Sequence, residues 1–282
     1  MPYVALITGA SSGIGEATAR RLAREPDVQL ILVARRDERL LALAEELGTA
    51  PTFVFPADLT EPGKPLQIAK VIEHKYGALN LLVNNAGARW AVDFSDGGWA
   101  NIERHMRINF EAPVRLVEAL LPLMRRTAAA AGSVDGGQRV TSFAGRPLKA
   151  PVAIVNVTST SARISRLGTG AYSASKNALA AWSDSLYLEE RRHGVHVADV
   201  LPGFIATEGF PQAELRASPL TRWAVSDAEQ VAEAIIEAGP GGVLERYVPR
   251  YYWIGSLLRV IAPGLIRRGA SSDRVSTNTR SV

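Results

Sequence analysis

The stretch Thr8-Gly9-Ala10-Ser11-Ser12-Gly13-Ile14-Gly15 decides the fold. It follows a short apolar run at residues 4–8 and opens an amphipathic stretch at residues 13–24. Glycines at such a place let the chain turn sharply, let backbone N–H groups approach a pyrophosphate and let the helix pack closely on its strand. The amino end of the helix adds a favourable dipole for an anion. The spacing therefore predicts a dinucleotide-binding turn, with an ordinary structural turn as the alternative.

Outward from this turn, apolar β-branched runs alternate with amphipathic stretches along most of the chain. The expected strands are residues 4–8, 28–34, 52–55, 79–83, 152–158, 195–201 and 246–248, and the expected helices are residues 13–24, 37–47, 65–75, 99–126, 171–193 and 227–238. Nearly continuous apolar strands joined by helices indicate a parallel sheet that is covered on both faces. We therefore predict an α/β fold, a single-domain doubly wound sheet in three α/β/α layers.

Composition excludes several classes of protein. With 47% hydrophobic and 21% charged residues, the 282-residue chain is close to the globular average, unlike disordered, fibrous or coiled-coil proteins. The absence of cysteine excludes a disulfide scaffold and thiol catalysis, and the four histidines lack metal-ligand spacing, so no metal site is expected. Basic and acidic residues number 32 and 28 and are mixed, which argues against nucleic acid as a partner. Neither a signal peptide nor a membrane span is recognisable, so we expect a cytoplasmic protein.

Residues 127–150 interrupt the alternation with a small, polar stretch. Such a composition predicts an exposed insertion. The stretch enters the fifth strand from its amino end, whereas ligands of open α/β sheets bind at the carboxyl ends. The insertion is therefore expected to lie away from the chemistry.

Residues 251–268 form a second departure, because they combine aromatic and aliphatic side chains with arginines. This pattern can dock on another subunit, cover the substrate cleft or make peripheral contact with a membrane surface. We therefore divide the chain into a nucleotide-binding domain at 1–250, which includes the insertion, and a C-terminal apolar and basic segment at 251–282. The tail from Ser271 onward is expected to be disordered.

Two arginines follow the second strand, about 20 residues past the glycines. An NAD site places an acidic residue there for the ribose 2′-hydroxyl, but this chain has Ala34-Arg35-Arg36. A guanidinium fork fits a phosphate, and its charge favours the 2′-phosphate of NADP. The alternative is a solvated surface pair. Asp37 is one position late for the acidic role and is expected to start the next helix.

A catalytic constellation is suggested by Tyr172-Ser173-Ala174-Ser175-Lys176. Residues i and i+4 share a helix face, so the phenol of Tyr172 and the ammonium of Lys176 can converge. A nearby cation lowers the pKa of a phenol from about 10 and suits it for proton transfer. Ser159, at the carboxyl end of the fifth strand, can donate a hydrogen bond to a substrate carbonyl. Each alone is equally compatible with a helix-surface pair and a capping serine.

Together these residues resemble the classical short-chain dehydrogenase/reductase family, in its NADP-preferring form, over about residues 3–238. The resemblance rests on the glycine turn, on Asn84-Asn85-Ala86-Gly87 after the fourth strand, and on Pro202-Gly203 after the sixth. It implies a Rossmann-type fold and four catalytic residues: Asn109, Ser159, Tyr172 and Lys176. It also implies a cofactor site made of Gly9, Ser11, Ser12, Gly13, Ile14, Gly15, Arg35, Arg36, Asp58, Leu59, Asn85, Ala86, Gly87, Tyr172, Lys176, Pro202, Gly203, Ile205 and Thr207.

The resemblance further implies an NADP(H)-dependent carbonyl reductase or alcohol dehydrogenase. Tyr172 would be the general acid or base and Ser159 would orient the carbonyl. Lys176 would lower the tyrosine pKa and bind the nicotinamide ribose, and Asn109 would hold a proton-relay water. Members of this family commonly assemble as dimers or tetramers, so the resemblance implies a homodimer or homotetramer.

The substrate is expected to contact residues 204–222, which offer Phe204, Ile205, Phe210, Leu215 and Leu220, with Trp90 as a further wall. These side chains favour an apolar ketone or aldehyde. Two other functions stay open at this point. One is a non-catalytic NADP-binding regulator, and the other is a lipid reductase that associates with a membrane surface through residues 251–268.

Overall fold

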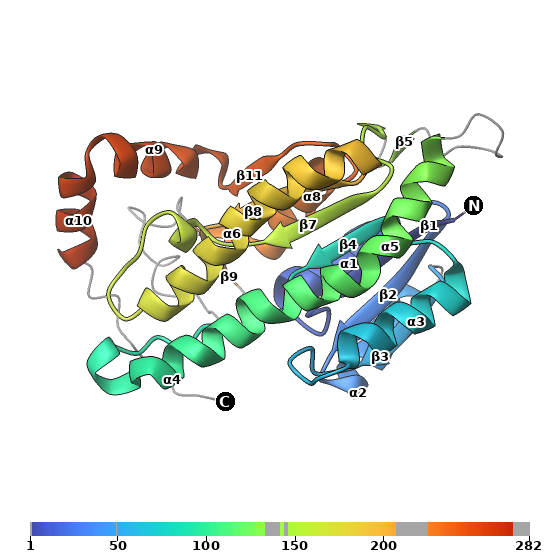
Figure 1. The fold of residues 1–282 in the computed structure, drawn as a ribbon, viewed down its shortest axis with the longest axis horizontal. Helices are drawn as coiled ribbons and strands as arrows, with labels where there is room; N and C mark the ends of the chain where they lie inside the picture. The colour runs from blue at the N-terminus through green and yellow to red at the C-terminus, as the bar shows by residue number, and fades with distance from the viewer. Residues whose placement is uncertain (1, 49, 133–141, 144–145, 207–224, 273–282) are drawn as a thin grey trace.

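The computed structural model describes residues 2–48, 50–132, 142–143, 146–206 and 225–272 (Figure 1). Its sheet strands are β1 (Tyr3–Thr8), β2 (Val28–Ala34), β3 (Thr52–Pro56), β4 (Leu81–Asn84), β7 (Ala153–Val157), β8 (His196–Pro202) and β11 (Glu245–Val248). The α-helices are α1 (Gly13–Leu22), α2 (Asp37–Leu47), α3 (Lys64–Tyr76), α4 (Phe94–Met106), α5 (Ala112–Gly132), α6 (Gly170–Glu190), α8 (Ala228–Ala238), α9 (Trp253–Ile261) and α10 (Pro263–Ser272). The shorter elements are η1 (Arg107–Glu111), β5 (Ser142–Phe143), β6 (Arg146–Pro147), η2 (Thr160–Ala162), η3 (Arg191–His193), β9 (Phe204–Ala206), β10 (Val225–Asp227) and η5 (Arg250–Tyr252).

The central sheet has seven parallel strands in the order β11-β8-β7-β4-β1-β2-β3. The direction of winding reverses between β1 and β4. In open α/β sheets a ligand crevice forms at the carboxyl ends of the strands where the winding reverses. The predicted doubly wound α/β fold is confirmed, and its switch point lies directly behind the glycine turn.

Two helical layers cover the sheet because successive side chains of a strand point to opposite faces. On β1, Tyr3, Ala5 and Ile7 pack in the cluster that contains the apolar residues of α1, α2 and α8. Val4 and Leu6 pack in the other cluster, with α3, α5 and α6. Both faces of the sheet are therefore buried, which explains the nearly continuous apolar strands.

The long helix expected at residues 99–126 is three elements. Gly98, at a φ of 49°, breaks the helical geometry inside α4, so the regular part of α4 begins after it. The five-residue π-helix η1 follows, and α5 then runs on to Gly132. A π-helix inserts a wider turn into an α-helix and is often found at functional sites. Asn109 lies in this turn and is buried.

The prediction of an exposed insertion over residues 127–150 was wrong at both ends. The alanine-rich start continues α5, where Thr127 is buried and its hydroxyl accepts a hydrogen bond from the N–H of Leu79. Alanine is the strongest helix former, which explains the extension. Farther on, Phe143 is buried against Tyr3 with ring centroids 4.6 Å apart. Because Tyr3 opens β1, this contact lies at the amino end of the sheet, as the strand order predicts.

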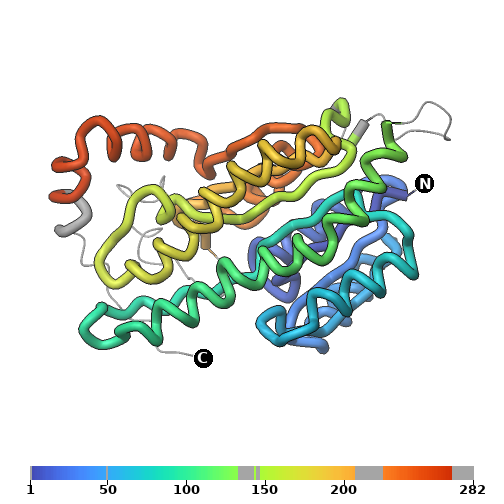
Figure 2. Tube along the Cα trace, viewed as in Figure 1, coloured from blue at the N-terminus to red at the C-terminus, as the bar shows by residue number. Residues whose placement is uncertain are grey.

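The C-terminal residues 250–272 form η5, α9 and α10, which we call the C-terminal arm. Figure 2 shows the arm leaving the body of the molecule after β11 and turning between its two helices. Within the described ranges, no helix has the length and apolar character to cross a membrane.

Candidate active site

The site begins where Thr8 ties the end of β1 to the end of β4. Its hydroxyl donates to the carbonyl of Val83 (3.1 Å) and accepts from the backbone N–H groups of Asn85 (2.9 Å) and Ala86 (3.0 Å). The side chain of Asn85 donates back to the carbonyl of Thr8 (2.9 Å). These bonds hold the glycine turn and the Asn-Asn-Ala-Gly segment at a fixed distance across the switch point.

The glycine turn leaves no room for side chains at two positions. Gly9 has a φ of 66°, and a Cβ there would lie 2.9 Å from the Cα of Ala86. A Cβ on Gly15 would overlap the carbonyl oxygen of Gly9. The turn therefore brings bare backbone to the amino end of α1, which is the arrangement that a pyrophosphate requires.

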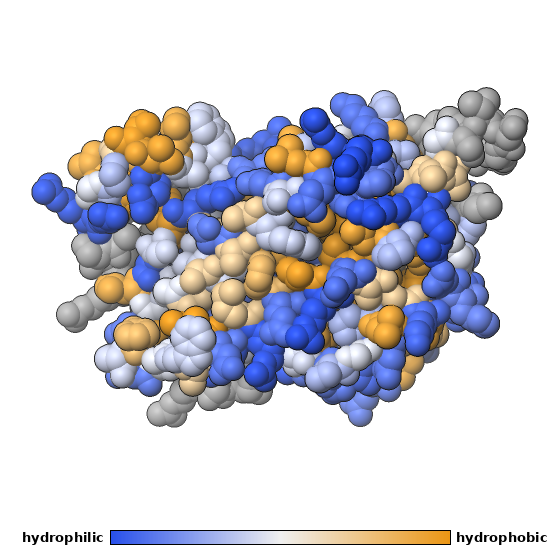
Figure 3. Space-filling model, viewed as in Figure 1, coloured by the Kyte–Doolittle hydropathy of each residue, from blue (hydrophilic) through white to orange (hydrophobic). Residues whose placement is uncertain are grey.

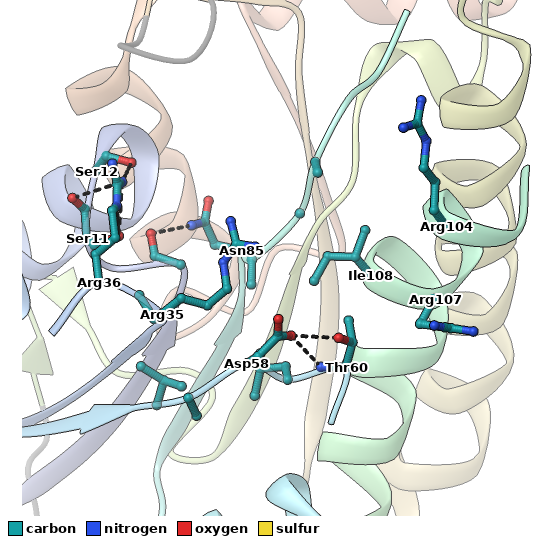
Figure 4. A pocket seen from close by; sticks show the side chains of 18 of the residues that line it. Ser11, Ser12, Arg35, Arg36, Asp58, Thr60, Asn85, Arg104, Arg107 and Ile108 are labelled. Atoms are coloured by element: carbon teal, nitrogen blue, oxygen red, sulfur yellow. Dashed lines mark hydrogen bonds between the residues drawn. The ribbon is translucent and has the colours of Figure 1, made fainter. Parts of the chain in front are cut away.

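A cavity of about 520 Å³ opens over this turn, and we call it the cofactor cavity (Figure 4). The cofactor residues expected from the sequence that line it are Gly9, Ser11, Ser12, Gly13, Ile14, Arg35, Arg36, Asp58, Leu59, Asn85, Ala86 and Gly87. Gly15 lies beneath the turn instead, where it allows the close approach of α1.

The two arginines after β2 have different positions. Arg36 lies across the turn and donates to the hydroxyls of Ser11 (3.1 Å) and Ser12 (2.7 Å). Arg35 points into the cavity (Figure 4). Burial opposes ionisation of Asp58, but hydrogen bonds from Thr60 and the charge of Arg35 lower the pKa of Asp58 below its usual value. This corner therefore presents guanidinium and hydroxyl donors suited to a phosphate.

A second cavity of about 380 Å³, the catalytic cavity, adjoins the first and shares Ile14, Asn85, Gly87 and Ala88 with it. The other residues expected from the sequence that line it are Ser159, Tyr172, Lys176, Pro202, Gly203, Phe204 and Ile205. The structure therefore brings together three of the four expected catalytic residues. Thr207, Phe210, Leu215 and Leu220 lie outside the described residues.

Ser159 caps η2, where its Oγ accepts the N–H of Ser161 (3.1 Å), and it hydrogen-bonds Tyr172. Burial raises the pKa of Tyr172, while the hydrogen bond from Ser159 and the charge of Arg89 oppose that rise. This differs from the expectation that Lys176 lowers the tyrosine pKa. In this structure burial prevails, and the cation that acts on the phenol is Arg89, because the ammonium of Lys176 is directed elsewhere.

Lys176 is buried and donates to the carbonyl of Val157 (2.8 Å), the last residue of β7. Burial lowers its pKa to about 8, although the negative charge of Asp199 acts in the opposite direction. A lysine of this kind can gain or lose a proton near neutral pH.

Asn109 does not line either cavity but stands directly behind them. Its amide donates to the carbonyl of Ala88 (2.9 Å) and to the hydroxyl of Ser175 (3.0 Å), and its Oδ1 accepts the N–H of Ala88 (2.9 Å). A Cβ on Gly87 would lie 2.8 Å from Oδ1 of Asn109 and 3.3 Å from Nζ of Lys176. The two side chains therefore converge behind Gly87.

Two arginines in the catalytic cavity were missed from the sequence. Arg89 follows the Asn-Asn-Ala-Gly segment, and its charge acts on Tyr172. Arg166, in the loop after η2, lies 4.1 Å from the centroid of the Phe204 ring. None of the described lining residues of this cavity is acidic. Loop arginines carry no periodic signal, so only their place in the fold reveals them.

Trp90 was expected beside the substrate but lines the cofactor cavity instead. The backbone N–H of Trp90 donates to Nε2 of His105 (3.0 Å), and the guanidinium of Arg104 lies 4.5 Å from the centroid of the Trp90 ring. His105 is fully buried, and burial lowers its pKa. It is therefore a packing histidine.

A buried polar row lies under the site and was also missed. Asn84, Asn156 and Asp199 occupy paired positions on β4, β7 and β8. Asn84 donates to Oδ1 of Asn156 (2.8 Å), and Asn156 donates to the hydroxyl of Ser183 (2.7 Å). Burial raises the pKa of Asp199 well above its usual value. Within the described ranges, no cluster of three or more potential metal ligands occurs.

Comparisons with known proteins agree with this geometry. The family model for short chain dehydrogenase matches residues 3–146 and 148–216. The chain is 29% identical over 281 residues to Dehydrogenase/reductase SDR family member 7B of Mus musculus, which covers 94% of this chain and 79% of the relative.

Two solved structures are also similar. A short-chain dehydrogenase from Streptomyces avermitilis is 26% identical, with a TM-score of 0.72 over 96% of this chain and 99% of the other. A metagenomic short-chain oxidoreductase in complex with NADP is 26% identical, with a TM-score of 0.65 over 84% of this chain and 90% of the other.

Proposed function

Because the chain belongs to the short-chain dehydrogenase family of oxidoreductases, we propose that it interconverts a carbonyl compound and the corresponding alcohol with NADP(H). The observation that carries the proposal is the convergence of Ser159, Tyr172 and Lys176 on one cavity that adjoins the glycine cradle. Such a pair of cavities can hold a dinucleotide in one and a small molecule in the other.

NADP(H) is the cofactor that the cofactor cavity fits. The bare backbone of the glycine turn would hold the pyrophosphate, and Asp58 with Leu59 would lie against the adenine. Arg35 and Arg36 supply the positive charge that a 2′-phosphate needs. The similar metagenomic oxidoreductase was solved with NADP, which supports the same assignment.

Bound nicotinamide supplies the hydride for reduction and accepts it for oxidation. Tyr172 donates its phenolic proton to the substrate oxygen in reduction and removes that proton in oxidation. Ser159 donates a hydrogen bond to the same oxygen and so holds the carbonyl beside the phenol. The hydrogen bond between Ser159 and Tyr172 places both groups within reach of one atom.

Lys176 and Asn109 complete the proposed proton path. Lys176 binds the nicotinamide ribose. With its pKa of about 8, it can also pass protons between the catalytic cavity and a water behind that cavity. Asn109, in the wider turn of η1, is the residue proposed to bind a water beside Lys176. We infer that this water links Lys176 to solvent.

The substrate is inferred to be a ketone or aldehyde with an apolar part, because Phe204 and Ile205 form one wall of the catalytic cavity. Arg89, and Arg166 beside the Phe204 ring, favour a polar or anionic group on the same molecule. Assembly as a homodimer or homotetramer is part of the proposal and is tested by light scattering of the purified chain.

The decisive experiment follows NADPH oxidation over a panel of apolar ketones and aldehydes. Tyr172→Phe should lower kcat by roughly 10²- to 10⁴-fold, because the general acid is lost. Tyr187→Phe, on the same helix but packed against the hydrophobic core, is the matched control. Equal turnover in wild type and Tyr172→Phe would overturn the mechanism. NADPH binding without turnover of any carbonyl would favour the alternative, a non-catalytic regulator.

A further inference from the structure

Helix α9 is turned with its polar and small residues toward the body of the protein. Arg259 lines a cavity together with residues 162–167, the loop after the catalytic serine. A Cβ on Gly255 would lie 3.1 Å from Cδ1 of Ile164, and Ser256 hydrogen-bonds Tyr247. The inner face of α9 is therefore the one that a surface helix ordinarily shows to water.

The outer face of α9 is apolar and exposed. Val260 is 77% exposed and Ile261 is 67% exposed, and Leu265 on α10 is 69% exposed. The other exposed apolar residues of the arm are Tyr251, Trp253, Ile254, Leu257 and Leu258. These eight are half of the sixteen large apolar side chains that are exposed in the described residues. Figure 3 shows a hydrophobic area at the upper left, over the place where Figure 1 draws α9 and α10.

The charge around this apolar face has one sign. Arg250, Arg259, Arg267 and Arg268 belong to the arm, and the sequence contains no aspartate or glutamate from residue 246 to residue 272. Arg250, at the base of the arm, is paired with Glu237, and Arg267 and Arg268 are the exposed cations on α10. Contiguous apolar surface on a monomer marks an interaction site. An apolar helix face flanked by arginines complements the acyl boundary and headgroups of an anionic bilayer. A second copy of the same arm would instead bring arginines against arginines.

The base of the arm reaches the catalytic cavity. The ring of Tyr252 lies against Gly203 so closely that a Cβ on Gly203 would overlap it. Gly203 lines the catalytic cavity, and the inner face of α9 packs on the loop that follows Ser159. The arm is therefore attached beside the catalytic cavity, through Tyr252 and through the loop that follows Ser159.

We propose that the C-terminal arm lies in the headgroup region of an anionic lipid bilayer, with the apolar face of α9 inserted and the exposed Arg267 and Arg268 on lipid phosphates. The arm then holds the catalytic cavity at the lipid surface, where apolar carbonyl compounds concentrate. This binding does not depend on the proposed reaction, so each can be tested without the other.

The test is co-sedimentation of the full chain with phosphatidylcholine vesicles, with and without phosphatidylglycerol. We expect binding that needs phosphatidylglycerol and weakens in high salt. The double variant Val260→Glu/Ile261→Glu should lower the partition coefficient at least ~30-fold, because two inserted side chains are lost. Leu188→Glu, on α6 and 62% exposed, is the matched control and should bind like wild type. Arg267→Gln/Arg268→Gln should lower binding by roughly 30-fold, because two headgroup contacts of about 1 kcal/mol each are lost.

Two further measurements guard against misfolding and self-association. Trp253 fluorescence should shift to the blue on anionic vesicles, and Trp253→Phe should remove that shift. NADPH oxidation with a water-soluble carbonyl should be unchanged in the glutamate variant. Three results would each overturn the proposal. The first is absence of vesicle binding, and the second is equal binding to vesicles without phosphatidylglycerol. The third is that the double variant Val260→Glu/Ile261→Glu converts an oligomer to a monomer without any loss of lipid binding.

Discussion

The ammonium of Lys176 lies 2.8 Å from the carbonyl oxygen of Val157, the last residue of β7 and two positions before Ser159. The strand end that carries the serine therefore also fixes the lysine, so the two side chains keep a constant separation. The lysine is buried at this position, with 4% of its surface exposed, and this burial lowers its pKa to about 8.

The buried lysine predicts a pH-dependent stability. Its folded-state pKa is about 8, whereas the ordinary value is 10.5, so the unfolded chain binds more protons between these two values. The stability of wild type should therefore rise with pH across this window relative to Lys176→Met, by about 1–3 kcal/mol. Urea unfolding at both ends of the window measures this difference. Lys70→Met, on the exposed side of α3, is the control, and parallel curves for wild type and Lys176→Met would contradict the prediction.

Arg89 should determine the pH at which Tyr172 loses its proton. Its positive charge lowers the pKa of Tyr172, so Arg89→Gln should raise that pKa. Alcohol oxidation needs the phenolate, so the rising limb of its kcat profile should move to higher pH in this variant. Arg166→Gln removes an arginine from the same cavity and should leave the profile in place. Identical shifts in both variants would mean that the general charge of the cavity, not Arg89, is responsible.

Arg35 should determine which cofactor binds. Arg35→Asp removes a cation and adds an anion at the edge of the cofactor cavity. We expect the Kd for NADPH to rise ~10- to 100-fold and that for NADH to change much less, because a charged hydrogen bond contributes about 1.5–3 kcal/mol. Fluorescence titration with both nucleotides measures this. Arg24→Asp lies away from the cavity and serves as control, and equal weakening of both cofactors would be the contrary result.

The contact between Tyr252 and Gly203 can be tested by a double-mutant cycle. Gly203→Ala should destabilise the fold by about 1–3 kcal/mol, because the new methyl group overlaps the ring. Tyr252→Ala should remove most of that penalty, giving a coupling energy of at least ~1 kcal/mol. Additive effects in thermal unfolding would indicate that the base of the arm is not packed on the catalytic cavity.

The order of strands and helices was predictable, because short continuous apolar runs and amphipathic runs of period 3.6 are local patterns. The π-helix was not, since one widened turn at Asn109 does not change the apolar pattern around it. Arg89 and Arg166 reach the catalytic cavity from loops, whose paths depend on tertiary packing. Similarly, the sequence of α9 predicts an amphipathic helix but cannot tell which face meets the protein.

Ser159, Tyr172 and Lys176, which the resemblance groups together, line one cavity, and their catalytic roles stay a prediction. The electrostatics of the tyrosine differ from the expectation. The pKa of Tyr172 is raised because the desolvation of a phenol depends on everything packed around it, and spacing along a helix contains no such information.

The row formed by Asn84, Asn156 and Asp199 favours one register of the central strands. If β7 slid by one residue along β4, Asn156 would lie opposite Val83, and its buried Oδ1 would lose the hydrogen bond from Asn84. That loss costs about 1–3 kcal/mol, in addition to turning every side chain of the strand to the wrong layer. Misaligned sheets are therefore disfavoured during folding. Ser159 lies three residues after Asn156, so its position depends on the amide hydrogen bonds beneath the catalytic cavity.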